Sequence, residues 1–167
     1  MSFEKIYEIM DASFPDSEMR TYLGQKGLLK NDRYKVFTKK NENNEIVAFI
    51  SAWNLPSCTF LEHFAVSEQL RGNGIGSKFF SEVIEQCEGI IFLEVEPPVD
   101  TITKKRIKFY ERFGFILNDF YYTQPPLRQE FGHMELKVMS YPRAFSEDEF
   151  SKYKDEIYKY VYNAKLK

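Results

Sequence analysis

Apolar residues recur along this chain with two different spacings. Near the N-terminus, Phe3, Ile6 and Met10 lie three or four residues apart, which predicts one apolar face of an amphipathic helix. The same spacing recurs in four later stretches, and Ser146 with Glu149 fits a capping box at the start of the last one. The predicted helices cover residues 3–13, about 17–27, 75–87, 102–113 and the chain from about 147.

Shorter runs that are rich in β-branched and aromatic residues predict strands. These runs cover residues 34–39, 45–53, 58–66, 90–96, 115–122 and 133–140. Residues 41–44 have a turn composition, so the first two strands are expected to form a hairpin. A strand–helix–strand–helix centre flanked by hairpins predicts an α/β (α+β) fold with a mixed sheet. We expect one domain over residues 1–167, with a core at about 34–141 and a C-terminal helix at about 146–164.

The composition excludes several classes of protein. With a formal net charge of −2, the chain lacks the excess of basic residues that is typical of a general nucleic-acid binder. The two cysteines do not form a C-x-x-C pair, and with two histidines in the chain no structural zinc site is expected. The apolar runs are too short to span a membrane. We therefore expect a cytoplasmic protein with no metal and with neither nucleic acid nor membrane as a partner. Aromatic residues, 17% of the chain, gather partly near the two ends, which predicts aromatic-rich helices packed onto the core.

A glycine-bearing loop, RGNGIGS at residues 71–77, lies between a predicted strand and a predicted helix. The first turn of a helix offers unpaired N–H groups, glycines allow close approach, and Arg71 adds a positive charge, so the loop could hold a phosphate or pyrophosphate. The glycines at 72, 74 and 76 match neither the Walker spacing nor the dinucleotide pattern G-x-G-x-x-G. A flexible turn and a nucleotide-phosphate site remain alternatives.

Two separate motifs carry a resemblance to a known family. Arg71, Gly74 and Gly76 resemble the acetyl-CoA signature Q/R-x-x-G-x-G/A of the GNAT N-acetyltransferase superfamily, and FYERFGF at residues 109–115 is similar to its Y-E-K-x-G-F element. The resemblance covers about residues 45–122. It implies a GNAT-like mixed, mostly antiparallel sheet with a central parallel strand pair splayed at the cofactor site, flanked by helices. The chain departs from the pattern by entering a helix almost at Met1, where the family usually begins with a strand.

The resemblance implies that an acetyl group moves from acetyl-CoA to a primary amine of a small molecule or peptide by direct attack. A non-enzymatic acyl-CoA-binding or regulatory module of the same fold is the alternative, and the protein is expected to be a monomer or a homodimer. Thr103 stands where family members often carry Asn, so one contact to the pantetheine arm is expected to be weaker. The residues implied in cofactor binding are Phe64, Ala65, Val66, Arg71, Gly72, Asn73, Gly74, Ile75, Gly76, Ser77 and Thr103.

The resemblance also implies roles in the chemistry. Backbone N–H groups of residues 64–66 would stabilise negative charge on the acyl oxygen, and Tyr110 would protonate the leaving thiolate, although Tyr110 could equally be a packed aromatic residue.

An ionised amine needs a proton acceptor, and a carboxylate inside an apolar strand is unusual because burying it unpaired is costly. We favour Glu62 as the base and Glu94 as a substrate-facing carboxylate. His63 and Glu96 are further candidates, and any of these could instead be a strand-end residue in water or an ion pair. Strand alternation predicts that Glu62 and His63 point to opposite faces. Trp53, Tyr121 and Tyr122 are expected near the acceptor, or as ordinary strand residues.

Overall fold

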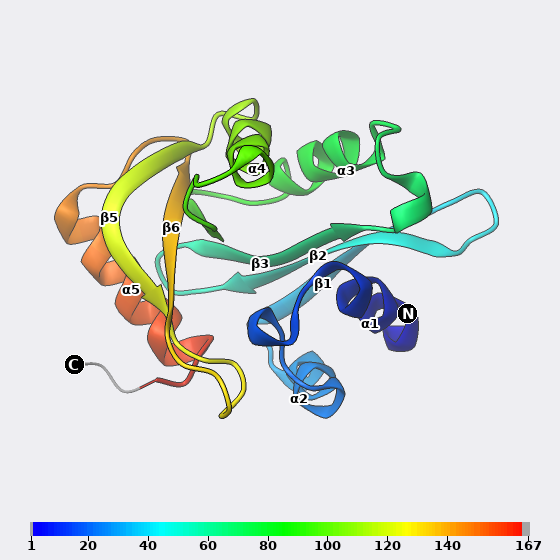
Figure 1. Ribbon diagram of the computed structural model, residues 1–167, viewed down its shortest axis with the longest axis horizontal. Coiled ribbons are helices and arrows are strands. Elements are labelled where there is room, and N and C mark those ends of the chain that lie inside the picture. The colour runs from blue at the N-terminus through cyan, green and yellow to red at the C-terminus, as the bar shows by residue number, and fades with distance from the viewer. Residues whose placement is uncertain (1, 165–167) are drawn as a thin grey trace. The chain divides into compact units, whose positions relative to one another are not determined.

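The computed structural model describes residues 2–164 (Figure 1). The chain divides into two compact units. The first takes the chain up to Trp53 together with Leu61–Cys87, and the second takes Asn54–Phe60 together with the chain from Glu88 onward.

The first unit begins with helices and continues with strands. Thr21 caps α2 by accepting a hydrogen bond from the N–H of Gly24 at 3.2 Å. Strands β1 and β2 form an antiparallel hairpin in which Tyr34 is paired with Trp53. The elements of this unit are α1 (Phe3–Ser13), α2 (Tyr22–Gly27), β1 (Tyr34–Lys40), β2 (Ile46–Asn54), β3 (Thr59–Val66) and α3 (Ile75–Ile84).

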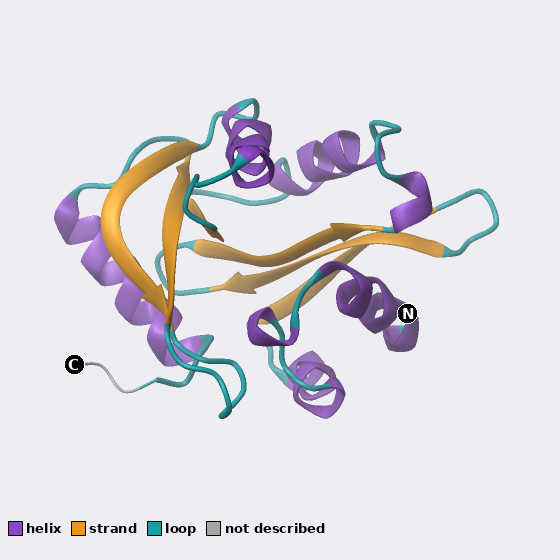
Figure 2. Ribbon diagram, in the orientation of Figure 1, coloured by secondary structure: helices purple, strands orange, loops and turns teal. Residues whose placement is uncertain are grey.

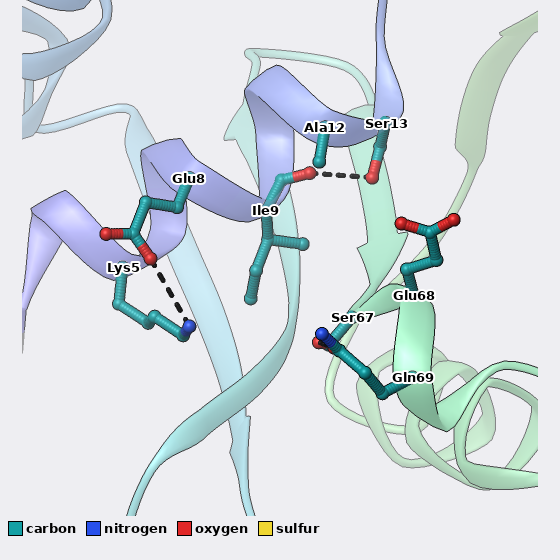
Figure 3. Close-up of a pocket in the computed structure, with 8 residues that line it drawn as sticks. All are labelled: Lys5, Glu8, Ile9, Ala12, Ser13, Ser67, Glu68 and Gln69. Atoms are coloured by element: carbon teal, nitrogen blue, oxygen red, sulfur yellow. Dashed lines mark hydrogen bonds and ion pairs between the residues drawn. The ribbon is translucent and has the colours of Figure 1, made fainter.

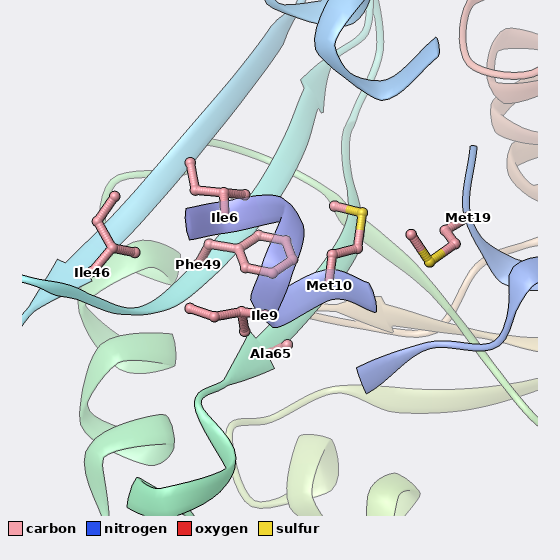
Figure 4. Close-up of a cluster of buried hydrophobic side chains, with 7 residues drawn as sticks. All are labelled: Ile6, Ile9, Met10, Met19, Ile46, Phe49 and Ala65. Atoms are coloured by element: carbon pink, nitrogen blue, oxygen red, sulfur yellow. The ribbon is translucent and has the colours of Figure 1, made fainter. Parts of the chain in front are cut away.

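The apolar face of α1 makes much of the core of this unit. Ile6, Ile9 and Met10 of the helix pack with side chains of the following loop and of two strands (Figure 4). Met10 is fully buried and Ile6 is 1% exposed. The periodicity of apolar positions in 3–13 therefore marks the surface that α1 buries. The strand and loop residues of this cluster are Met19, Ile46, Phe49 and Ala65.

The second unit holds the remaining strands and the C-terminal helix. Strand β6 pairs antiparallel with both β4 and β5. Phe150 of α5 stacks on Phe120 of β5 with ring centroids 4.4 Å apart, and α5 runs along β5 and β6 (Figure 2). The elements of this unit are β4 (Ile91–Val95), α4 (Thr101–Glu111), β5 (Ile116–Gln124), β6 (Met134–Tyr141) and α5 (Glu147–Tyr160).

The strands follow the order β1-β2-β3-β4-β6-β5. The first residues of β3 belong to the second unit, where the N–H of Thr59 donates to the carbonyl of Ile90 just before β4. β3 and β4 are parallel, and the other pairs are antiparallel. The predicted mixed, mostly antiparallel α/β sheet with a parallel pair and flanking helices is confirmed.

The helix predicted over 17–27 is wrong in its first half. Residues 16–18 form one 3-10 turn, Met19 is extended, and the helix begins only at Tyr22. Thr21 supplies the N-cap there, and such a capping hydroxyl favours a helix start immediately after it. The capping box of Ser146 and Glu149 is present at the start of α5. In the described part of the chain, helices α1 and α2 precede the first strand.

Candidate active site

The glycine loop leaves its backbone open at two positions. Gly72 has φ = 85° and Gly74 has φ = 76°, a conformation that side chains rarely adopt. A Cβ atom at either residue would meet no other atom within 4 Å. Gly74 is also the N-cap of α3, so unpaired N–H groups of the first helical turn follow directly. The loop therefore fits the phosphate-binding site that its sequence predicts.

Gly76 has a different role in the same motif. A Cβ atom there would lie 3.2 Å from Cγ2 of Val66 and 3.6 Å from Cζ of Phe64. Both side chains come from β3, and Phe64 in turn stacks on Phe80 of α3 with ring centroids 5.5 Å apart. The missing side chain at this position allows α3 to pack closely against the end of β3.

The guanidinium group of Arg71, which precedes the glycines, is held in place by two hydrogen bonds. Nε of Arg71 donates to the carbonyl of Val66 at 3.1 Å, and Nη2 donates to Oγ of Ser13 at 3.0 Å. The guanidinium group is thereby held beside the end of β3 and the end of α1, while it stays exposed to solvent. Ser13 also borders a pocket between α1 and the turn after β3 (Figure 3); its lining residues are Lys5, Glu8, Ile9, Ala12, Ser13, Ser67, Glu68 and Gln69.

Tyr110 stands near the end of α4 in an aromatic setting. Its ring lies 5.3 Å from that of Phe109 and 6.0 Å from that of Phe115. Burial raises the pKa of Tyr110 to about 12, although the nearby Arg106 acts in the opposite direction. At neutral pH the phenol is therefore protonated, which is the state that a general acid requires.

Glu62 lies in a buried ion pair. Its side chain is 2% exposed, and its Oε1 accepts from Nη2 of Arg20 at 2.8 Å. Oε2 accepts from the indole N–H of Trp53 at 3.2 Å. Burial alone would raise the pKa of Glu62, but the Arg20 guanidinium and the neighbouring His63 ring outweigh it and lower the pKa below its usual range. The carboxylate is therefore held ionised and is a weak base.

Glu62 and His63 both contact the segment between α1 and α2. Nε2 of His63 lies 2.7 Å from the carbonyl of Glu18, and Glu62 binds Arg20 two residues further on. Nδ1 of His63 is 3.6 Å from Oε2 of Glu62. Because burying a carboxylate without a partner is costly, Arg20 stabilises Glu62 in this position.

Replacing Arg20 by methionine should lower the free energy of unfolding by about 3–5 kcal/mol, because it would leave the Glu62 carboxylate buried without its partner. Urea unfolding at pH 7 measures the change. The control is Lys26→Met, since the ion pair of Lys26 with Glu4 is exposed and should contribute little.

The loss of stability expected for Arg20→Met should depend on pH, because it arises from the ion pair between Arg20 and Glu62. The pKa of Glu62 is lowered in the folded state. The contribution of Glu62 to the free energy of unfolding is therefore complete above its pKa in the unfolded chain, about 4.3, and is lost as the pH falls towards its pKa in the folded protein. The difference between wild type and Arg20→Met should therefore shrink between pH 5 and pH 3. A difference that stayed constant, or a loss below about 1 kcal/mol at pH 7, would contradict a stabilising pair.

Glu94 is half-buried and is bound by two tyrosine hydroxyls. The hydroxyl of Tyr122 donates to Oε2 and that of Tyr162 donates to Oε1, both at 2.5 Å. Burial raises the pKa of Tyr122 well above its usual value, and the Glu94 carboxylate adds to the effect. Tyr162 is not among the site residues expected from the sequence; the one sequence signal for it is its four-residue spacing from Tyr158 at the end of the last helix.

The other residues considered from the sequence are found in varied settings. Trp53 is 1% exposed, whereas Tyr121 is 76% exposed. Thr103 is 4% exposed, and its hydroxyl completes a capping box with Asp100 at the start of α4, so it has a structural role in the helix cap. Glu96 forms an exposed ion pair with Arg106 at 3.1 Å.

Two further classes of site are absent from residues 2–164. No group of three or more His, Cys, Asp or Glu side chains in this range could hold a metal ion. Within the same range, the helices are all too short or too polar to cross a membrane.

Comparison with known proteins decides the family. The family model described as acetyltransferase (GNAT) family matches residues 3–115, which include the glycine loop and Tyr110. The chain belongs to the GNAT family of acetyltransferases. YjbC of Bacillus subtilis (strain 168), described by its name as an acetyltransferase, is 29% identical over 163 residues, which are 95% of this GNAT chain and 82% of YjbC.

Solved GNAT structures agree with this assignment. A GNAT-family protein from Bacteroides thetaiotaomicron superposes with a TM-score of 0.90 at 26% identity and covers 98% of this chain and 93% of its own. An aminoglycoside 6'-N-acetyltransferase, solved as a complex with coenzyme A, has a TM-score of 0.60 at 14% identity, covering 85% of this chain and 92% of its own. At that identity the likeness concerns the fold alone.

Proposed function

We propose that this GNAT chain is an acetyl-CoA-dependent N-acetyltransferase that acts on a primary amine of a small molecule or peptide by direct attack. The observation that supports this most strongly is the open glycine loop at the N-terminus of α3, beside the fixed guanidinium group of Arg71. The structurally similar aminoglycoside acetyltransferase was solved with coenzyme A, and its name gives an amine acceptor. The family model spans parts of both units, which supports treating them as one domain.

The proposed cofactor site uses the backbone more than side chains. N–H groups at Gly74, Ile75 and Gly76 would hold the pyrophosphate, and Arg71 would add charge beside it. Backbone N–H groups of residues 64–66 would stabilise negative charge on the acyl oxygen. Acetyl-CoA, when bound, supplies the acetyl thioester. Thr103 is left out of this proposed set because its hydroxyl is engaged in the cap of α4.

Two side chains have proposed roles in proton transfer and charge. Tyr110 would give its proton to the departing thiolate, since its raised pKa keeps the phenol protonated. Glu62 is a poor match to a general base, because its ion pair with Arg20 lowers its pKa far from neutral pH. We therefore propose that the negative charge of Glu62 acts by balancing the positive charge of Arg20. The proton that the acceptor ammonium group loses would then pass to solvent.

A thermal-shift titration followed by a thiol-release assay tests this function. Acetyl-CoA at a hundredfold excess over Kd should stabilise the protein by about 2.7 kcal/mol, and ATP or NAD at the same concentration should not. Thiol release should then exceed background with at least one member of a panel of primary amines and peptides. Binding without release for any acceptor would favour an acyl-CoA-binding module, and preference for ATP or NAD would contradict the assignment of the loop.

A further inference from the structure

The hydroxyl group of Ser13, the last residue of α1, connects this helix to the guanidinium group of Arg71. Oγ of Ser13 donates to the carbonyl of Ile9 at 2.6 Å (Figure 3) and accepts from Nη2 of Arg71 at 3.0 Å. A serine hydroxyl has one proton, and the bond to Ile9 uses it, so the hydroxyl acts towards Arg71 as an acceptor. All three residues belong to the first unit.

The end of α1 is a favourable place for a positive charge. The C-terminus of a helix carries a partial negative charge, which attracts cations within the last turn. Residues 10–13, the last turn of α1, include no basic side chain. Arg71, which lies 58 residues further along the chain than Ser13, therefore supplies the cation at this helix end.

The second hydrogen bond of Arg71 anchors it beside the first turn of α3. Nε of Arg71 donates to the carbonyl of Val66 at 3.1 Å. Cγ2 of the same valine lies 3.2 Å from the place that a Cβ atom would take at Gly76, in the first turn of α3. That turn supplies the unpaired N–H groups of the proposed phosphate site. A guanidinium group has five N–H donors, and the bonds to Val66 and Ser13 use two of them.

We propose that Ser13 is a positioning residue for the cofactor: it holds the guanidinium group of Arg71 in the orientation in which further N–H groups donate to the pyrophosphate of acetyl-CoA. This inference rests on the proposed function for the identity of the ligand. With the bond to Val66 alone, the end of the arginine side chain would rotate more freely. Ordering it on binding would then cost conformational entropy. With Ser13 in place, the side chain is ordered before the cofactor binds.

Calorimetric titration of the full chain with acetyl-CoA tests this role. Ser13→Ala should lower the affinity about three- to tenfold, the size expected for ordering one long side chain on binding. Ser13→Thr keeps the hydroxyl and should bind within about twofold of the wild type, whereas Ser13→Val, which has the shape of threonine without the hydroxyl, should show the same loss as Ser13→Ala. The matched control is Ser2→Ala, at the other end of α1, where the serine makes no cap hydrogen bond; its affinity should be unchanged.

A double-mutant cycle separates positioning from a general effect on α1. Arg71→Ala alone should lower the affinity for acetyl-CoA at least as much as Ser13→Ala does. In the Arg71→Ala background, Ser13→Ala should change the affinity by less than about twofold, because the group that Ser13 positions is gone. A distortion of α1 that weakened binding by another route would lower the affinity equally in both backgrounds.

The outcomes distinguish this inference from the proposed function. If the wild type does not bind acetyl-CoA, the proposed function is contradicted and this inference is overturned with it. If the wild type binds and Ser13→Ala binds equally well, only this inference is overturned. An equal loss in both backgrounds, or no rescue by Ser13→Thr, would likewise overturn it alone. If Ser13→Ala fails to fold by circular dichroism, the pair Ser13→Thr and Ser13→Val decides, and equal affinities in that pair would overturn the role of the hydroxyl.

Discussion

Tyr110→Phe should lower kcat by about 10²- to 10⁴-fold, the range typical of losing a positioned general acid. The variant keeps the ring that packs on Phe109 and Phe115 and removes only the hydroxyl. Affinity for acetyl-CoA should therefore stay nearly unchanged. Single-turnover thiol release measures the chemical step, and fluorescence or calorimetric titration measures cofactor affinity.

The control for this substitution is Tyr141→Phe. The Tyr141 ring lies 5.2 Å from that of Phe115, in the same aromatic group, so it tests whether any lost hydroxyl there slows the reaction. Because the pKa of Tyr110 is raised to about 12, the wild type should show no loss of rate from this group up to about pH 10. Unaltered turnover in Tyr110→Phe would leave Tyr110 as a packed aromatic residue.

Gly74→Glu should abolish acetyl-CoA binding. A carboxylate would stand at the N-cap of α3, where the proposed pyrophosphate binds, and two negative groups would compete for the same N–H donors. A Cβ atom at Gly74 would meet no other atom within 4 Å, so no steric clash at Cβ accompanies the added charge. Calorimetric titration with acetyl-CoA should show no saturable binding at concentrations that saturate the wild type.

Two further variants separate the charge from the backbone effect. Gly74→Ala adds strain at φ = 76° without charge, so it should lower stability by about 1 kcal/mol and weaken binding only moderately. Gly132→Glu adds the same charge at another glycine, whose Cβ would also meet no atom within 4 Å, and it should bind acetyl-CoA normally. Retained affinity in Gly74→Glu would mean that the phosphates bind elsewhere.

Much of the fold was predictable because its signals are local. The spacing of Phe3, Ile6 and Met10 placed α1 within its observed bounds, since apolar periodicity directly reflects the face that a helix buries. The capping box at Ser146 likewise marked the start of α5. The helix predicted over 17–27 was wrong in its first half because Arg20 and Met19 are used in tertiary contacts, an ion pair and core packing, from an extended segment.

In the candidate site, too, some features were predictable from local sequence and others were not. The glycine spacing predicted which residues leave the backbone open, because left-handed φ values and close approach are properties of glycine itself. The settings of the carboxylates could not be predicted. Glu62 has its partner 42 residues earlier in the chain and Glu94 has one 68 residues later, and no local pattern encodes such distances.

The order of helices and strands, the glycine loop and the family resemblance can be inferred from the amino-acid sequence, because each depends on residues close together in the chain. The role of each ionisable group follows from the folded structure. That structure gave Glu62 a guanidinium partner that lowers its pKa, gave Tyr110 surroundings that keep it protonated, and brought Tyr162 to Glu94. The physical reason is that burial and charge pairing set the protonation state of a side chain, and both arise from residues distant in sequence.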